Sequence, residues 1–371
     1  MPQKQIKLEI KERLIALAQA LVDQKKAEVK VEPMERSSGF WYGGGDMIQE
    51  ADGSLVICGR YRNFGDSRTG VEAGTRGLEC ALFRAPGFDK PFEKIKAFTK
   101  AELTCNGKEV TSIEGTSFRQ TPEGAELYIS SEKAIPYPEE VKSFQKPGTG
   151  VWTIDLIDAP TASELSPANI REVLAGSTPA GLHVKDPVIA DDGARDAQLI
   201  YCIHPFAWSS SYSGLAVRKQ GTDNFEVINA NILPRGPVWD IAASRVTDRM
   251  PVPQVGVLKD LPPLSLYFYD GAECLRQHDE NPRAVKRPRG WSCEEIGGVA
   301  WGWDDDCPNM ERLSINAPLF VSHQGTGCSR YVATLVTDDT VYATWQQSQD
   351  DLSQPLVGHS LSMEEVGDIL S

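Results

Sequence analysis

Apolar and polar positions near the start of the chain follow the period of an α-helix. Residues 3–26 place Ile10, Leu14, Leu17 and Leu21 on one stripe, with Lys, Glu and Gln elsewhere, which is the periodicity of an amphipathic helix. It is the one long helix that the pattern predicts. We expect it to pack as a strap on the side of the following domain; the alternative is an arm that docks on a second copy of the chain as a homodimer.

Beyond this helix the pattern changes to short apolar runs separated by turn residues, which predicts β-strands. Three segments repeat one order: an acidic residue, a short apolar strand, a polar turn with Gly, and a second apolar strand. They read GGGDMIQEADGSLVICGR at 43–60, IEGTSFRQTPEGAELYISSE at 113–132 and VKDPVIADDGARDAQLIYCIH at 184–204. Two fainter copies contain the segments 238–246 and 316–335.

The repeat therefore has five units, which open at polar or acidic residues. These openings are Asp46, Glu114, Asp186, Asp240 and about Asn316. A unit of a few antiparallel strands cannot bury both of its faces alone, whereas radial packing of several units does so. We predict an all-β fold: a five-bladed β-propeller over 37–371, preceded by an N-terminal helical extension over 1–30. A two-sheet sandwich is the alternative, but sandwiches rarely repeat at this period.

Charge and cysteine spacing narrow the class of protein. The formal net charge of -14 disfavours partners such as nucleic acid or an anionic membrane surface, which require a basic face. The first segment has no apolar run longer than LIALA, and no segment approaches the ~20 apolar residues that span a bilayer. Eight cysteines never lie closer than 14 residues, so free thiols and a cytoplasmic location are expected.

Three acidic residues are the best candidates for catalysis. Asp46, Glu114 and Asp186 each open an inner strand of the predicted propeller, so they should converge at its axis. Cleavage of a glycosidic bond needs one carboxylic acid that protonates the leaving oxygen and one carboxylate that activates water or attacks directly. The alternative for each residue is a structural role, in which its side chain accepts hydrogen bonds from turn amides.

Further polar and aromatic residues near these openings are candidates for binding the substrate. Aromatic rings can lie against the C–H face of a sugar, and arginines suit a carboxylate, sulfate or phosphate through paired hydrogen bonds. Each residue could instead serve the core or stiffen a loop. The candidates are Trp41, Arg60, Arg62, Asp66, Arg68, Glu132, Lys185, His204, Trp208 and Asp240.

Motifs of other enzyme classes are missing from the sequence. It contains no GxxxxGK[ST], GxGxxG, GxSxG or HExxH, so nucleotide-binding, α/β-hydrolase and zincin functions lack support. The five histidines have no metal-ligand spacing. We predict neither an obligatory metal nor a cofactor.

Short motifs resemble those of the five-bladed glycosidases, namely the arabinanase and xylosidase family 43, the invertase family 32, and families 117 and 130. KDPV around Asp186 resembles the motif whose Asp stabilises the transition state or orients the acid. EGTSF around Glu114 resembles the motif that bears the general acid, and Asp46 matches the Asp of the first blade. In families 43 and 32 the acid follows the DP-type Asp, whereas Glu114 precedes Asp186, so the assignment of acid and base stays open.

The sequence and this resemblance together predict a glycoside hydrolase acting on a small carbohydrate, with inversion of configuration. Asp46 would be the base, Glu114 the acid, and Asp186 would hold the substrate or tune the acid. Two alternatives are a glycoside phosphorylase, in which an arginine of the segment 60–68 holds phosphate, and a non-catalytic propeller that binds glycans or proteins. In the non-catalytic case the central acids should be paired with basic side chains.

Overall fold

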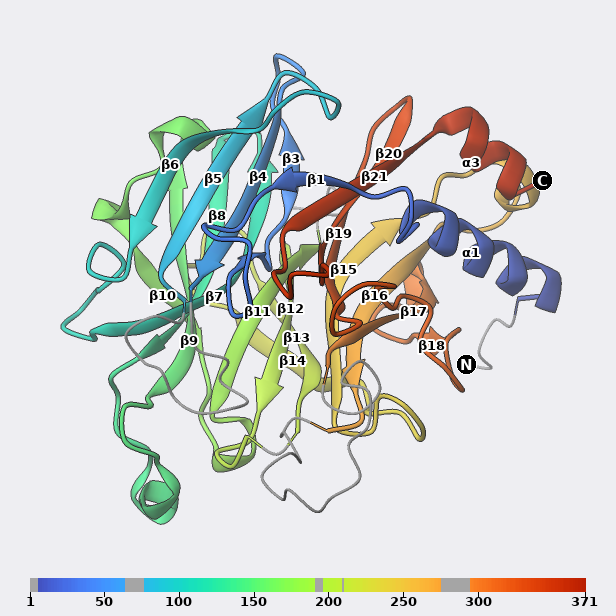
Figure 1. Cartoon of the computed structure of the whole chain (residues 1–371). Coiled ribbons are helices and arrows are strands. Elements are labelled where there is room, and N and C mark those ends of the chain that lie inside the picture. Colours follow the sequence, from blue (N-terminus) through green and yellow to red (C-terminus); the bar gives the residue numbers. More distant parts are fainter. Residues whose placement is uncertain (1–5, 64–76, 191–195, 209, 275–293) are drawn as a thin grey trace.

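The computed structural model describes residues 6–63, 77–190, 196–208, 210–274 and 294–371. The strands in these ranges form five antiparallel sheets that follow one another along the chain and pack radially as the blades of a propeller (Figure 1). The predicted all-β, five-bladed fold with an N-terminal helix is confirmed.

The first three blades take up the first two thirds of the chain, and each runs from the axis outward in sequence order. Blade 1 consists of β2 (Trp41–Gly43), β3 (Met47–Gln49), β4 (Leu55–Arg62), β5 (Glu79–Ala85) and β6 (Glu93–Thr99). Blade 2 consists of β7 (Val110–Thr121), β8 (Gly124–Lys133), β9 (Val151–Ala159) and β10 (Arg171–Ala175). Blade 3 consists of β11 (His183–Ala190), β12 (Ala197–His204), β13 (Tyr212–Arg218) and β14 (Glu226–Leu233).

The last blade is completed by a strand from the beginning of the chain, which closes the ring. Blade 4 consists of β15 (Ala243–Pro251), β16 (Leu264–Ala272), β17 (Ile296–Trp303) and β18 (Glu311–Arg312). Blade 5 consists of β19 (Ser329–Val336), β20 (Thr340–Gln347), β21 (Leu356–Ser362) and, as its outermost strand, β1 (Glu28–Val31). The antiparallel pairing of β1 with β21 joins segments more than 300 residues apart.

The inner strands of blades 4 and 5 begin later than the sequence repeat predicts. They start at Ala243 and Ser329 instead of at Asp240 and Asn316. The segments before them contain prolines and glycines, in LPRGPVWD and NAPLFVSHQGTG, and proline cannot donate to the hydrogen-bond ladder of a central strand. The predicted openings of these two units were therefore wrong by 3 and 13 residues.

Helix α1 (Leu8–Leu21) packs on the outside of blades 4 and 5, beside the C-terminal helix α3 (Met363–Ile369) (Figure 1). Its apolar stripe is buried in one cluster with Trp301 of blade 4 and Trp345 of blade 5. The helix therefore packs on the side of the propeller, as the first of the two interpretations predicted, and this packing buries its apolar stripe. Leu8 is the large apolar residue of α1 that stays exposed.

Short 3₁₀ helices interrupt the loops between the strands. They are η1 (Glu139–Phe144), η2 (Ala162–Glu164), η3 (Pro167–Asn169), η4 (Pro179–Gly181), η5 (Gly256–Leu258) and η6 (Asp304–Asp306). None of the helices in the described ranges is long and apolar enough to cross a membrane.

Candidate active site

Charged side chains from all five blades meet around the propeller axis, near the starts of the inner strands. Ion pairs and ring contacts connect them into one network, here called the upper layer. The upper layer consists of Arg60, Arg62, Glu114, Lys185, Asp186, Arg245, Asp270, Glu295, Arg330 and Tyr331. Five of these side chains are basic and four are acidic, so the network carries one more basic than acidic group.

Glu114, on the inner strand of blade 2, is held by two arginines of blade 1. Its Oε2 accepts hydrogen bonds from Arg60 Nε at 3.2 Å and Nη2 at 3.1 Å, and its Oε1 lies 3.5 Å from Arg62 Nη1. Burial alone would raise the pKa of Glu114, but Arg60, Lys185 and Arg62 hold it well below its usual value. Glu114 is therefore a carboxylate at neutral pH.

Asp186, on the inner strand of blade 3, contacts the backbone of Gly115, the residue that follows Glu114. The backbone N–H of Gly115 donates to Asp186 Oδ1 at 3.1 Å, while Arg245 Nη1 donates to Oδ2 at 3.1 Å. A Cβ on Gly115 would come within 2.6 Å of Asp186 Oδ1, so the EGT motif requires glycine here. Glu114 and Asp186, predicted as partners from the sequence, are thus brought together.

Arg245 connects the acids of blades 3 and 4. Besides Asp186, its guanidinium contacts Asp270 Oδ2 at 2.7 Å and Glu295 Oε1 at 3.1 Å. Glu295 is also paired with Arg330 of blade 5. Burial would raise the pKa of Glu295, but the neighbouring basic groups hold it well below its usual value. These contacts extend the charged network from blade 3 through blade 4 to blade 5.

The ring of Tyr331 occupies the centre of this network. Its centroid lies 4.1 Å from the guanidinium carbon of Arg245, 5.1 Å from that of Arg60 and 5.3 Å from that of Arg330. Tyr331 has a φ of 54°, and Asp186 has a φ of 50°. Positive φ in such residues costs about 1–3 kcal/mol and occurs preferentially at functional sites, so this strain is a further reason to treat the axis as the candidate site.

Asp46 lies further along the axis, in what we call the lower layer. Its Oδ2 accepts hydrogen bonds from Ser117 Oγ at 2.9 Å and from Phe118 N at 3.4 Å, and its Oδ1 from Met47 N at 2.6 Å. Ser117 and Phe118 follow Glu114 by three and four residues on the same strand. Asp46 therefore binds a deeper level of β7 than the one that carries Glu114.

Three consecutive glycines set the position of Asp46. Gly43 ends β2, and Gly44 and Gly45 follow it before β3; Gly44 has a φ of 70°, which favours glycine. A Cβ on Gly45 would lie 1.9 Å from the carbonyl oxygen of Cys58 on β4. The GGGD motif is thus a break in the inner strand that allows close contact with β4 and turns Asp46 into the axis.

Asp46 shares the lower layer with a second acid that the sequence did not reveal. Asp248 of blade 4 accepts hydrogen bonds from the backbone N–H of Thr334 at 2.8 Å and from its hydroxyl. Burial raises the pKa of Asp46 to about 6, although the hydrogen bonds from Met47, Ser117 and Phe118 act to lower it. Burial and the charge of Asp46 raise the pKa of Asp248 to about 8. This layer therefore holds a proton near neutral pH, unlike Glu114.

An aromatic wall borders the upper layer at blade 3. The ring of Trp208 stacks on His183 at 4.1 Å and lies 4.8 Å from His204. Trp208 has a φ of 54°, and its Nε1 donates to Tyr137 Oη at 3.2 Å. Burial, together with Lys185, lowers the pKa of His183 to about 3, so this imidazole is neutral. Trp208 is thus a fixed, partly exposed ring beside the charged network.

Other predicted binding residues are placed differently. Trp41 is only 4% exposed, and the guanidinium groups of Arg62 and Arg330 lie 4.9 Å and 4.6 Å from its ring. This packing leaves little of the Trp41 ring for a sugar. Asp66 and Arg68 lie outside the described residues.

Glu132 and Asp240 are also buried, at 1% and 0% exposed. Glu132 Oε1 accepts a hydrogen bond from the backbone N–H of Gly150 at 2.6 Å, which connects β8 with the start of β9. Asp240 Oδ2 accepts from Arg312 Nε at 2.8 Å, on the outermost strand of its own blade. Both contacts connect neighbouring segments of the chain, so a binding role for Glu132 and Asp240 stays a prediction.

Several residues of the network were missed from the sequence, chiefly those of blades 4 and 5. A signal existed: the inner strands of both blades carry Ser-Arg near their starts, in Ser244–Arg245 and Ser329–Arg330. The starts of these two units were predicted at Asp240 and Asn316, so the Ser-Arg pairs were not recognised as equivalent positions of the repeat. Asp270 comes from a second strand, and no repeat position points to it.

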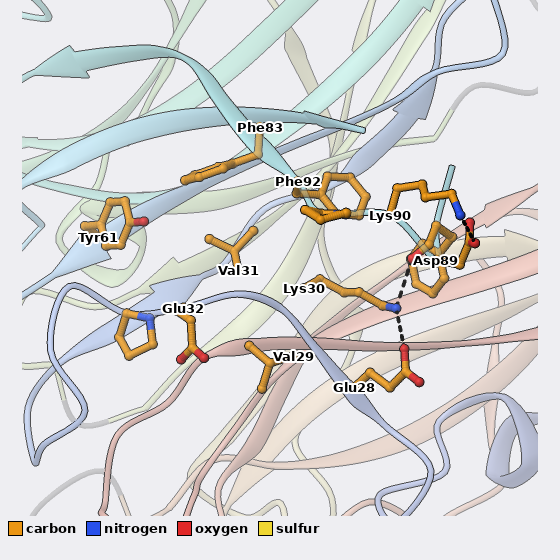
Figure 2. Close-up of a pocket in the computed structure, with 13 residues that line it drawn as sticks. Glu28, Val29, Lys30, Val31, Glu32, Tyr61, Phe83, Asp89, Lys90 and Phe92 are labelled. Atoms are coloured by element: carbon orange, nitrogen blue, oxygen red, sulfur yellow. Dashed lines mark hydrogen bonds and ion pairs between the residues drawn. The ribbon is translucent and has the colours of Figure 1, made fainter. Parts of the chain in front are cut away.

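The described ranges contain no group of three or more His, Cys, Asp or Glu that could hold a metal ion. They do contain an outer groove of about 570 Å³ between β1 and blade 1, lined among others by Tyr61, Phe83, Phe92 and Lys30 (Figure 2). None of the upper-layer residues lines this groove. The axial network and the outer groove are therefore separate features.

Comparison with solved structures agrees with this fold. The chain is similar to a protein solved as a BT0996 RGII complex, with a TM-score of 0.61, 11% identity and 96% of both sequences covered. It is similar to a glycoside hydrolase with a TM-score of 0.59, 11% identity and the same coverage. It also resembles β-1,2-mannobiose phosphorylase from Listeria innocua, with a TM-score of 0.52, 12% identity, and coverage of 92% of this protein and 95% of the phosphorylase.

No protein-family model matches the chain, and no curated protein does either. At identities near 11%, the structural likeness establishes the fold. The function has to be argued from the residues at the axis.

Proposed function

We propose that this chain is a glycoside hydrolase that cleaves a glycosidic bond in a small oligosaccharide or glycoside. The observation that carries the proposal is the meeting of Glu114 and Asp186, from adjacent blades, at the propeller axis beside the partly exposed ring of Trp208. Hydrolysis of a glycoside requires one carboxyl group that holds a proton and one carboxylate, and Asp46, which binds the same strand β7 through Ser117 and Phe118, is a further carboxyl group at the axis. That solved glycoside hydrolases share this fold supports the proposal.

We assign the roles of two carboxyl groups the other way round from the sequence expectation. Glu114 stays ionised because of Arg60 and Arg62, so at neutral pH it holds no proton for the leaving oxygen, and of the two roles only that of the base is open to it. Asp46, with a pKa raised by burial to about 6, suits the group that holds a proton for the leaving oxygen. Asp186, between Lys185 and Arg245, would orient the sugar. The reaction would invert the anomeric configuration.

The test compares Asp46→Asn and Glu114→Gln on substrates with good and poor leaving groups. If Asp46 protonates the leaving oxygen, Asp46→Asn should lose most activity on alkyl glycosides but keep much of it on dinitrophenyl glycosides, which need no proton. Glu114→Gln should lose activity on both by about 10²-fold or more. The reverse pattern would restore the original assignment. Full activity of both variants would end the hydrolase proposal, and proton NMR of the first product anomer tests inversion.

A second candidate function has a specific observation in its favour. Glu114 and Asp186 are only 5% and 4% exposed, and both are paired with basic side chains, as expected of a non-catalytic propeller that binds glycans. This candidate predicts saturable binding of a glycan with no turnover in any glycoside screen.

A cytoplasmic location and a homodimer also remain proposals. A dimer contact through α1 would have to use its outer face near Leu8, because its apolar stripe is buried within the chain. Analytical ultracentrifugation of the wild type and Leu8→Glu tests that contact.

A further inference from the structure

The outer groove is a cavity that the axial network does not use. It has a volume of about 570 Å³, within the range of roughly 300–1,000 Å³ that is typical of small-molecule pockets. One wall is the outermost strand of blade 5, β1, and the other consists of β4, β5 and the loop after β5 in blade 1 (Figure 2). The groove therefore has room for a ligand, and that ligand has to suit both walls.

The wall that belongs to blade 5 is the free edge of a strand. Every residue from Glu28 to Pro33 lines the groove, although successive side chains of a strand point to opposite faces, so the groove follows the edge of the strand. β1 pairs with β21 on one side, and no strand of the described ranges pairs with it on the other. A free edge presents backbone N–H and C=O groups, which are available to the polar groups of a ligand.

The wall that belongs to blade 1 combines aromatic rings with an unused hydroxyl. Tyr61 and Phe83 are each 7% exposed, whereas Phe92 is only partly buried. The Oη of Tyr61 forms no hydrogen bond with any described residue, and Figure 2 shows it directed toward Val31 and Phe83, two other residues of the groove. Burial, together with two nearby carboxylates, raises the pKa of Tyr61 to about 12. The hydroxyl therefore keeps its proton and can donate it to a hydrogen bond with a ligand.

The charged residues of the groove are already compensated. Each of them is paired with a neighbouring residue of opposite charge. The pairs are Lys30 with Glu28 at 3.0 Å, Lys90 with Asp89 at 2.7 Å, and Glu32 with Arg36. A ligand with a net charge would therefore find no unpaired partner among the residues that line the groove.

These features together select the chemical class of the ligand. A purely apolar ligand would cover the hydroxyl of Tyr61 and the edge of β1 without replacing their hydrogen bonds to water, which is costly. A charged ligand would have to compete with the existing ion pairs. A neutral sugar brings apolar C–H faces for the rings and hydroxyl groups for the polar atoms.

An extended peptide brings similar groups, but the edge of β1 is poorly suited to a further strand. β1 has four residues, its register shifts between Val29 and Val31, and Pro33 follows it closely. Short strands, bulges and proline are features that protect an edge from strand addition. The groove therefore favours a sugar over a peptide.

We propose that the outer groove is a second ligand site, which binds a neutral sugar unit apart from the propeller axis. The ring of Phe92 lies against a C–H face of the sugar, Tyr61 donates to one of its oxygens, and the edge of β1 binds further hydroxyl groups. The site goes beyond the proposed hydrolase function and does not depend on it, because none of the upper-layer residues lines the groove.

Isothermal titration calorimetry measures the binding of glucose, galactose, xylose and arabinose to the wild type, Tyr61→Phe and Phe92→Ala. Tyr201→Phe is the matched control for the hydroxyl, since Tyr201 is also buried, has a pKa raised by burial to about 12, and does not line the groove. Phe144→Ala is the control for the ring, since Phe144 is 59% exposed and lies outside the groove. We expect at least one sugar to bind, Tyr61→Phe and Phe92→Ala to weaken it by about 2- to 10-fold each, and both controls to match the wild type.

The variant Trp208→Ala separates the groove from the axis, because it removes the ring beside the charged network and does not touch the groove. Binding that is lost in Trp208→Ala but kept in Tyr61→Phe and Phe92→Ala would place the sugar at the axis and overturn the proposal. The absence of binding by all four sugars would overturn it too, as would tighter binding of glucuronate than of glucose in Trp208→Ala. Circular dichroism checks the fold of each variant, and the conservative Tyr61→Phe decides alone if Phe92→Ala does not fold.

A peptide probe and a turnover assay complete the test. Binding of a hexapeptide of alternating valine and threonine, without binding of any sugar, would reassign the groove to strand addition and overturn the proposal. Turnover of nitrophenyl glycosides is measured on the same variants. Sugar binding that depends on Tyr61 and Phe92, without turnover in the wild type, would support the groove site and contradict the hydrolase. Turnover without such binding would do the opposite.

Discussion

Replacing Arg60 by methionine removes the strongest partner of Glu114 while keeping an apolar stem of similar length. Arg60 donates twice to Glu114 Oε2, at 3.2 Å and 3.1 Å, and is 1% exposed. Two unit charges about 4 Å apart interact by about 4 kcal/mol at an effective dielectric constant of about 20. Since 1.4 kcal/mol is tenfold in proton affinity, Arg60→Met should raise the affinity of Glu114 for protons by about a hundredfold to a thousandfold.

The assay is the pH dependence of kcat/KM between about pH 3 and 8. In the wild type, Glu114 stays ionised throughout this range, so it produces no acidic limb. In Arg60→Met an acidic limb should appear, with activity falling as the pH is lowered and Glu114 takes up a proton. Arg84→Met is the control, because Arg84 lies on β5 of the same blade but is paired at the surface with Asp52.

Stability provides a second readout that needs no turnover. The folded pKa of Glu114 lies below its unfolded value of about 4.3, so the pair contributes stability that is present above that pH and lost as pH falls through the folded pKa. Breaking such a buried pair costs about 3–5 kcal/mol, and urea unfolding at pH 7 should show most of it. An unchanged pH profile together with a loss no larger than that of Arg84→Met would refute the reasoning.

Three further predictions concern other parts of the molecule. Asp248→Asn should reduce the loss of stability between about pH 5 and 8 in thermal unfolding, because the raised folded pKa values of Asp46, about 6, and Asp248, about 8, add stability at low pH that is lost as pH rises through them; a parallel pH curve would contradict this. Gly115→Ala should cost about 1–3 kcal/mol and most activity, measured by urea unfolding and turnover, whereas a silent variant would show that Gly115 and Asp186 are not in close contact. Leu17→Ala should cost about 2–5 kcal/mol in urea unfolding, against about 0.5 kcal/mol for the exposed control Leu8→Ala; equal losses would refute packing of α1 on the propeller.

The part of the fold that could be predicted from the sequence is the part in which local pattern and tertiary contact agree. Blades 1 to 3 repeat an acidic opening, an apolar strand and a turn, and the structure places Glu114 and Asp186 on inner strands as expected. In blades 4 and 5, a loop with prolines or glycines precedes the inner strand, so the acidic opening no longer marks its start.

The candidate site was predictable in the acids of blades 2 and 3 and in three bases, Arg60, Arg62 and Lys185. These bases were expected to bind the substrate, and they pair with Glu114 and Asp186 instead. Arg60 lies on β4 of blade 1 and reaches Glu114 on the next blade, a contact that no periodicity encodes. Asp248 of the lower layer was missed for a different reason. It is the sixth residue of β15, and an acidic residue in the middle of a strand is ordinarily expected to face solvent. Protonation states depend on such long-range neighbours, so the roles of acid and base could not be read from motif order.

The pairing of β1 with β21 also bears on how the protein is made. At a synthesis rate of about 5–20 residues per second, β1 leaves the ribosome on the order of tens of seconds before its partner strand exists. Throughout that interval the apolar stripe of α1 lacks the surface of Trp301 and Trp345 that buries it in the finished molecule. The apolar stripe of α1 is therefore exposed in the nascent polypeptide until the strands of blades 4 and 5, which are synthesised much later, are available to bury it.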